Sequence, residues 1–260
     1  MGNHSRSLTI WVWAGIASVI AFWWLVSLTQ LEYLFPGPLP TLHALIRLLA
    51  SSDFYGALGL TLGRALVGLF AAAIIGIGWG YAAGKYEWFS AYTRPLLQIL
   101  MSIPPVVLVI LAMVWFGSNG TVVVFVVTLV TTALFTTSTR EAIRSMDRDL
   151  LEMATVFKLS KRRTFRHVIS PMIAPPVLAA ATVALGHSVR VSVMAELLAT
   201  STGIGASIRL AQINIETPDV FAYAITMATV TFVLEGVFVR PLSRRMQKHQ
   251  EAVQQSSNAS

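Results

Sequence analysis

The sequence predicts an all-α membrane protein that crosses the bilayer six times. Of the 260 residues, 55% are hydrophobic and only 12% are charged, and the mean hydropathy is +0.68. A soluble domain carries about twice that share of charged residues. The apolar residues are also gathered into separate stretches, most of which approach the roughly 20 residues that a helix needs to cross a hydrocarbon core. These observations exclude an ordinary soluble domain.

Six apolar stretches are the expected membrane helices, with the fourth short for a span. They are residues 10–28, 60–83, 96–116, 122–137, 172–197 and 221–239. The first is as long as a full span, and no small-residue cleavage site precedes Tyr33. We therefore expect it to remain as a helix and not to be removed as a signal peptide.

The segment 35–41 contains three prolines and should break the chain after the first helix. A short helix over residues 41–50 can follow. We expect an external elbow at residues 35–57, which separates the N-terminal tail and a peripheral first helix (1–34) from a five-helix core (58–241). The tail 242–260 is polar, and we expect it to be cytoplasmic and disordered.

Small residues recur every four positions along the second stretch, at Gly68, Ala72, Gly76, Gly80 and Gly84. Residues at this spacing lie on one face of a helix. Small side chains let two membrane helices approach closely, where no hydrophobic effect drives them together. The pattern predicts a packing seam.

Prolines interrupt two of the later stretches. Pro104 and Pro105 fall inside the third, while Pro171, Pro175 and Pro176 stand at the start of the fifth. Proline in a membrane helix frees backbone carbonyls, which neighbouring helices or a water-lined cavity must satisfy. The kinks can border a pathway or merely bend the helices for packing, and the sequence favours neither.

The positive charges predict the orientation. Placing the N-terminus inside puts all but four of the 19 Lys and Arg residues in cytoplasmic segments, the exceptions being Arg47, Arg64, Arg190 and Arg209. Because cytoplasmic loops are enriched in Lys and Arg, both termini are expected in the cytoplasm. Topology and contact with anionic lipid then explain the net charge of +7, and no nucleic-acid surface is expected.

The central loop, residues 140–171, holds 12 of the 31 charged residues. Apolar residues recur within it at steps of three and four, at Ile143, Met146, Leu150, Met153, Ala154 and Phe157. This spacing predicts an amphipathic helix over residues 144–157, with one face that needs an apolar partner. We interpret the loop as a cytoplasmic docking element.

The same loop resembles the loop that marks the membrane subunits of ATP-binding-cassette importers. That pattern is Glu-Ala-Ala, three residues, Gly, nine residues, Ile, one residue, Leu-Pro, and the matching positions are Glu152, Met153, Ala154, Lys158, Val168, Ser170 and Pro171. Lys158 and Ser170 depart from the pattern. If the family glycine has positive φ, a lysine there costs roughly 1 kcal/mol, so the turn is either reshaped or simply helical.

Further motifs resemble the nitrate, sulfonate and taurine branch of these importers, and the resemblance spans nearly the whole chain. They are the proline-rich segment 36–40, Thr61-Leu62-Gly63-Arg64, Pro104 and Pro105 followed by Trp115-Phe116-Gly117, and Ala195-Glu196-Leu197-Leu198 followed by Gly203 and Gly205. Each motif is short, and their order together with the central loop carries the resemblance.

The resemblance implies the core of a type I importer permease in a bacterial inner membrane. It implies a second permease copy, expected to give a homodimer, two cytoplasmic ATPase subunits that bind ATP and Mg, and an extracytoplasmic solute-binding protein. In the loop, Glu152 would be a polar anchor on the ATPase, and Met153, Ala154 and Phe157 would supply apolar contact beside Lys158 and Pro171. The basic run 161–166 would meet lipid or the ATPase.

Three polar residues near the outer half of the fifth helix are candidates for the solute pathway, namely His187, Arg190 and Glu196. His187 and Arg190 are three positions apart and share a helix face. An intramembrane charge costs on the order of 3 kcal/mol unless it is paired or hydrated. Arg190 can therefore attract an anionic solute, helped by His187, or it can snorkel outward or pair with Glu196 for structure.

Other classes of function have less support in the sequence. An enzyme would need a catalytic or metal-binding cluster, yet the five histidines are scattered and cysteine is absent. The run 78–85 lacks the spacing of a phosphate-binding loop, so no ATP site, cofactor or metal site is expected in this chain. An ATP-independent channel or secondary carrier remains the alternative, although such a protein has no need of the charged central loop.

Overall fold

The computed structural model describes residues 2–146 and 148–239, which form helices joined by turns, with no strand in that part of the chain. The helices in chain order are α1 (Gly2–Thr29), α2 (Pro38–Ala50), α3 (Ser52–Lys85), α4 (Glu87–Ser102), α5 (Pro105–Phe116), α6 (Gly120–Arg144), α7 (Arg148–Val156), α8 (Lys161–Thr164), the π-helix η1 (Phe165–Ile169), α9 (Ser170–Ala199), α10 (Ile204–Ile213), α11 (Thr217–Leu234) and the π-helix η2 (Glu235–Val239).

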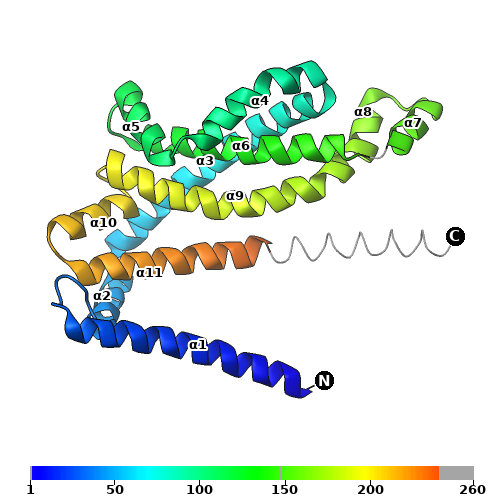
Figure 1. Cartoon of the computed structure of the whole chain (residues 1–260). Coiled ribbons are helices and arrows are strands. Elements are labelled where there is room, and N and C mark those ends of the chain that lie inside the picture. Colours follow the sequence, from blue (N-terminus) through cyan, green and yellow to red (C-terminus); the bar gives the residue numbers. More distant parts are fainter. Residues whose placement is uncertain (1, 147, 240–260) are drawn as a thin grey trace.

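Helices α3, α6 and α9 pack together at the centre of the molecule (Figure 1). The predicted seam of small residues lies between α3 and α6. A Cβ atom added to Gly76 would lie 2.8 Å from the Thr132 carbonyl oxygen, and one added to Gly80 would lie 2.6 Å from that of Thr136. The two backbones are thus too close for any larger side chain, and the packing seam is confirmed.

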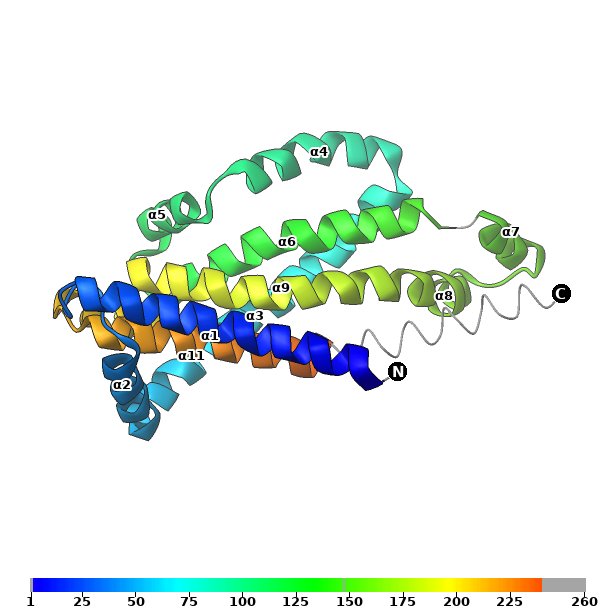
Figure 2. The ribbon, with the colours of Figure 1, turned by 60° about the horizontal axis from the view of Figure 1, so that its bottom comes forward.

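The third apolar stretch forms two helices, α4 and α5, whose axes differ by 99°. Ile103 has an extended backbone, as the residue before a proline prefers, and neither Pro104 nor Pro105 can donate the hydrogen bond that would continue α4. The predicted interruption is therefore a complete break. Helix α4 also begins at Glu87, nine residues before the apolar stretch, and stands off from the rest of the molecule (Figure 2).

Helix α1 has the expected peripheral position. None of its most apolar window is buried. It is held at its C-terminal end, where the Trp23 Nε1 atom donates to the Pro36 carbonyl at 3.0 Å and the Trp23 ring stacks on Phe221 of α11. The short helix expected in the elbow is α2, which begins three residues earlier than predicted because Pro38 and Pro40 favour a helix start.

The chain passes back and forth between two ends of the molecule. Five helices are long and apolar enough to span a membrane, or six if α4 and α5 count as one broken span. The fourth apolar stretch is short for a span, but the helix that contains it, α6, continues through polar residues to Arg144. The start of α1 and the end of η2 lie toward the end that carries α7 and α8 (Figures 1 and 2). The polar tail expected at residues 242–260 lies outside the described residues.

The central loop departs from the prediction, because no single helix runs over residues 144–157. Arg144 is the last residue of α6, which is closed by the Ser145 amide donating to the Glu141 carbonyl and the Met146 amide donating to the Ile143 carbonyl. Met146 is buried in a small cluster with Ala142 and Ile173. Ile143 and Met146 therefore belong to the packing of α6, and the separate helix α7 begins at Arg148.

Candidate functional site

Helix α7 ends at a backbone turn centred on Lys158. This residue has φ = 51°, the left-handed conformation that favours glycine. The Leu159 amide donates to the Ala154 carbonyl at 3.0 Å, and the Lys158 amide donates to the Thr155 carbonyl at 2.9 Å. This pair of bonds is the Schellman motif. The turn is therefore retained despite the lysine, and neither the reshaped nor the helical alternative applies.

The predicted coupling residues of α7 are mostly exposed. Ala154 is only 2% exposed, whereas Met153 is 48% exposed and Phe157, just after the helix, is 71% exposed. Glu152 is also exposed. Helix α7 itself lies against η1. Among the described side chains, Ala154 thus packs the helix against the chain, while Met153 and Phe157 point away from it.

Short capped segments connect α7 to the long helix α9. The Ser160 side chain caps α8 by accepting from the Arg163 amide at 3.4 Å. In η1, the Phe165 ring packs edge-on against Tyr81 of α3, with centroids 5.8 Å apart. Pro171 is the second residue of α9, where the chain passes directly from η1 into that helix. The predicted site residues of the loop thus form one continuous path from α7 into the core.

Two of the predicted pathway residues lie along one side of α9. The Arg190 side chain is 69% exposed, and its Nη2 atom lies 3.5 Å from the Glu235 Oε1 atom at the end of α11. His187 is half-buried, one turn earlier. The pairing of Arg190 with Glu196, considered from the sequence, does not occur. Glu235 was not found from the sequence, although an acidic residue in an apolar stretch is a signal that a partner is needed.

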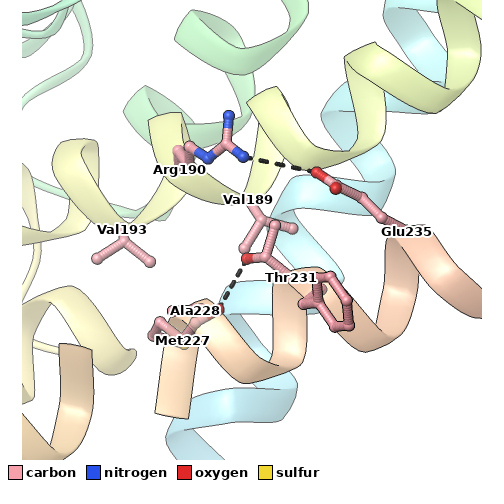
Figure 3. Close-up of a pocket in the computed structure, with 8 residues that line it drawn as sticks. Val189, Arg190, Val193, Met227, Ala228, Thr231 and Glu235 are labelled. Carbon is pink, nitrogen blue, oxygen red and sulfur yellow. Dashed lines mark hydrogen bonds and ion pairs between the residues drawn. The ribbon is translucent and has the colours of Figure 1, made fainter. Parts of the chain in front are cut away.

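A pocket of about 450 Å³ separates α9 from α11 beside this ion pair (Figure 3). Arg190 and Glu235 face each other across its edge, while Val189, Val193 and Met227 supply apolar wall. His187 lines a different cavity, of about 310 Å³, beside the break between α4 and α5. The exposed side of α9 is therefore flanked by a cavity on each side, with the Arg190 guanidinium at the edge of one of them.

Glu196 has a different environment from the other two candidates. Its side chain has no exposed surface, so it cannot touch a solute in this conformation. The Arg64 Nη1 atom lies 2.6 Å from one carboxylate oxygen, and the Thr61 hydroxyl lies 2.7 Å from the other. The Gly205 amide donates to the carboxylate at 3.2 Å. Thr61 and Arg64 come from α3, so Glu196 links α3 to α9.

The same network holds the turn that follows α9. Arg64 donates to the Thr202 carbonyl at 2.9 Å and to the Thr202 hydroxyl at 2.8 Å, and the Thr61 hydroxyl accepts from the Ile204 amide at 2.9 Å. Gly203 has φ = 98°, and any Cβ atom there would overlap the Glu196 carboxylate. The sequence motifs around residues 61–64 and 195–205 are thus halves of one structural network, a contact that the sequence analysis missed.

Comparison with known protein families gives one match over most of the chain. The family model described as "Binding-protein-dependent transport system inner membrane component" matches residues 72–248. The match includes the central loop, α9 and Glu235, although Thr61 and Arg64 lie before its first residue.

Individual proteins agree with this match. The chain is 27% identical over 249 residues to the taurine transport system permease protein TauC of Escherichia coli (strain K12), covering 93% of this chain and 90% of that protein. It is 29% identical over 238 residues to the putative aliphatic sulfonates transport permease protein SsuC of Bacillus subtilis (strain 168), covering 89% and 84%. A bacterial alginate ABC transporter, solved with its alginate pentasaccharide-bound periplasmic protein, has a chain of the same fold with a TM-score of 0.63 and 16% identity, covering 95% and 99%.

Proposed function

Because this chain belongs to the family of binding-protein-dependent transport system inner membrane components, we propose that it forms the solute pathway of an ATP-binding-cassette importer driven by a separate ATPase. The chain is a multi-pass transport subunit of the inner membrane. Its expected relation to the nitrate, sulfonate and taurine branch is confirmed by the taurine and sulfonate relatives, and the type I permease fold by the solved structures.

The observation that carries the ATPase assignment is the form of α7. It ends in a backbone turn that Lys158 keeps at positive φ, and it leaves Met153 and Phe157 exposed. Exposed apolar residues on a short polar segment are typical of a surface that binds another protein. We assign that surface to a groove on the ATPase, with Glu152 as the polar anchor. ATP and Mg are then bound by the ATPase and not by this chain.

The assembly that follows has two copies of this chain and two ATPase subunits. The arrangement of α7, the start of α1 and the end of η2 toward one end supports a topology with both termini on the ATPase side, in the cytoplasm. The opposite end carries α2 and α10, and we assign it to the solute-binding protein. The periplasmic protein in the alginate transporter structure supports that assignment.

For the solute, we propose a small anion, such as a sulfonate, taurine or nitrate. Arg190 is exposed beside an apolar pocket and has only one described carboxylate partner, Glu235, at 3.5 Å. An anionic solute can compete for such a guanidinium, because the pair is neither buried nor tight. The taurine and sulfonate relatives support this class of solute. Glu196 is assigned a structural role, because it is buried against Arg64.

The ATPase assignment is tested by purifying the tagged chain in mild detergent and measuring the ATPase activity that accompanies it, with and without Glu152→Arg. The substitution is expected to remove the activity, because it reverses the charge at the proposed anchor. The matched control is Glu32→Arg, which makes the same change at an exposed position near the opposite end. A folded chain that always purifies without ATPase activity would contradict the proposal and favour an ATP-independent channel or carrier.

The solute assignment has its own test, which is uptake of radiolabelled taurine, an alkanesulfonate and nitrate by cells that contain the whole transporter. Arg190→Gln should raise the KM for the transported anion at least tenfold while leaving the ATPase subunits bound. Arg209→Gln is the control, since that residue is an arginine near the outer end that donates to the Leu197 and Thr200 carbonyls. Unchanged uptake in Arg190→Gln would refute the anion site.

A further inference from the structure

The largest of the cavities described for this chain lies at its α7 end. Its volume is about 610 Å³. The end of α3, the start of α4, the end of α6 and the π-helix η1 all contribute to its lining, through Tyr81, Gly84, Lys85, Glu87, Ile143, Arg144, Met146 and Ile169. None of these residues has a part in the pathway or in the ATPase contact proposed above.

Two cations line this cavity. Lys85 and Arg144 are the last residues of α3 and α6, and both are exposed. A basic residue at a helix C-terminus is already favourable, because it offsets the helix dipole. Here, however, two helix ends bring their cations to one cavity, and no described carboxylate forms an ion pair with either. Glu87 is the one acidic side chain in the lining.

Aromatic residues next to the cavity indicate its depth in the membrane. Tyr86, Trp88 and Tyr92 follow Lys85 directly and are 46%, 70% and 69% exposed. Exposed tyrosine and tryptophan rings gather at the membrane–water interface, where lipid headgroups lie. The Lys85 Nζ atom also lies 5.3 Å from the centroid of the Tyr86 ring. The cations of the cavity are therefore at headgroup level.

The rest of the lining is apolar, through Ile143, Met146 and Ile169. A soluble anion would satisfy the cations and leave these side chains against water, whereas a molecule with an anionic head and an apolar tail fits both parts. Basic pockets between membrane helices on the cytoplasmic side are suited to anionic headgroups. We propose that this cavity binds the phosphate headgroup of an anionic phospholipid, with Lys85 and Arg144 as its cationic contacts.

A lipid bound there would join three parts of the chain, namely the turn between α3 and α4, the end of α6, and η1. α7 follows the end of α6 in the chain and leads through α8 into η1, and Tyr81 in the cavity wall already packs on Phe165 of η1. The bound headgroup thus supports the base of the coupling segment. The proposal depends on the membrane location of the chain, and not on which solute it carries.

The test is native mass spectrometry of the full chain from bilayer discs of equal parts phosphatidylcholine and phosphatidylglycerol. The unmodified chain should retain phosphatidylglycerol in preference to phosphatidylcholine. One interfacial cation is worth about fivefold in affinity, so Lys85→Gln with Arg144→Gln should weaken the retention roughly 25-fold. The control pair Arg94→Gln with Arg47→Gln removes the same charge from exposed positions outside the cavity and should change retention less than threefold.

Glu87→Gln is expected to change lipid binding in the opposite direction, which a folding defect could not do. Removing the acidic side chain from the cavity should tighten phosphatidylglycerol binding by a few-fold. The proposal would be overturned if the cavity pair and the control pair lost phosphatidylglycerol retention equally, or if Glu87→Gln did not increase that retention. Displacement of the lipid by millimolar inorganic phosphate would also overturn it, because the site would then prefer a soluble anion. None of these measurements needs the ATPase or a solute, so they are independent of the proposed function.

Discussion

The two ends of the molecule are stabilised in different ways. At the outer end, the buried Glu196 carboxylate binds Arg64, Thr61 and the Gly205 amide, so α3, α9 and the turn before α10 are tied together by side chains. At the inner end, which carries α7, backbone hydrogen bonds close that helix, and Met153 and Phe157 are left exposed. The Glu196 network is complete within one chain, whereas Met153 and Phe157 at the α7 end are left uncovered by the described residues.

This difference predicts that some substitutions will change the stability of the chain and others will change only the proposed contact between α7 and the ATPase. Substitutions at the outer network should damage folding, because a buried charge without its partner is strongly unfavourable. Substitutions on the exposed side of α7 should damage only the contact with the partner, because they remove nothing that the free chain buries. Four substitutions test that contrast, in order of the size of their expected effect on the free energy of unfolding.

The largest effect is expected from Arg64→Ala. The Glu196 carboxylate would stay buried without its counter-ion, which lowers the free energy of unfolding by about 3 to 5 kcal/mol. The measurement is reversible unfolding in detergent micelles. The control is Arg47→Ala, which breaks the ion pair with Asp219 at the same end, where the Arg47 side chain is 69% exposed. That change should cost less than about 1 kcal/mol, and equal losses would remove the distinction between the two pairs.

Next comes Gly203→Ala, which tests how tightly the outer turn fits. An alanine at φ = 98° is strained, and its Cβ atom would overlap the Glu196 carboxylate. We expect a loss of roughly 2 to 4 kcal/mol from the two effects together. Gly63→Ala in α3 serves as control, since a Cβ atom added at that position would lie in open space. A Gly203→Ala chain as stable as the control would show that the turn adapts freely.

At the inner end, Lys158→Gly should stabilise the chain. Glycine accepts the positive φ of this turn without strain, and its extra freedom in the unfolded chain offsets part of the gain, leaving about 0.5 to 1 kcal/mol. Hydrogen exchange of the α7 amides should slow accordingly. Lys161→Gly, at the start of the helical α8, should have the opposite sign. Faster exchange in Lys158→Gly would contradict the strain assigned to the turn.

The smallest effect on stability is expected from Phe157→Ser. Its ring is 71% exposed, so the free energy of unfolding should change by less than about 0.5 kcal/mol. Phe135→Ser is the comparison in the core, because that ring is only 2% exposed, and it should cost about 3 kcal/mol or more. A large loss with Phe157→Ser would mean that the inner end is already covered by the chain itself.

The sequence predicted those features that depend on local chemistry. The spacing of Gly76 and Gly80 identified the face of α3 that packs closely against another helix, because four-residue spacing defines a helix face without naming its partner. Pro104 and Pro105 identified the break in the third span, since proline cannot continue the hydrogen bonding of a helix. The motif around Glu152 also raised the question of positive φ at Lys158, and the structure shows that φ to be positive.

The features that it missed depend on contacts between distant segments. Arg64 and Glu196 are 132 residues apart, and helix periodicity says which way a side chain points without naming what it meets. For the same reason, the periodicity placed Ile143 and Met146 on an amphipathic helix, although these residues pack at the end of α6. The sequence offered Glu196 as the structural partner of Arg190, whereas the fold places Glu235 beside Arg190 instead.

The glycine seam between α3 and α6 has a mechanical consequence. The backbones of the two helices are in contact over several turns, so the helices cannot slide or rotate past one another without a clash. We therefore expect α3 and α6 to move as one rigid unit. Motion during transport must then be absorbed elsewhere. The 99° break between α4 and α5 lies outside this rigid pair, so we expect a change of conformation to bend the chain there.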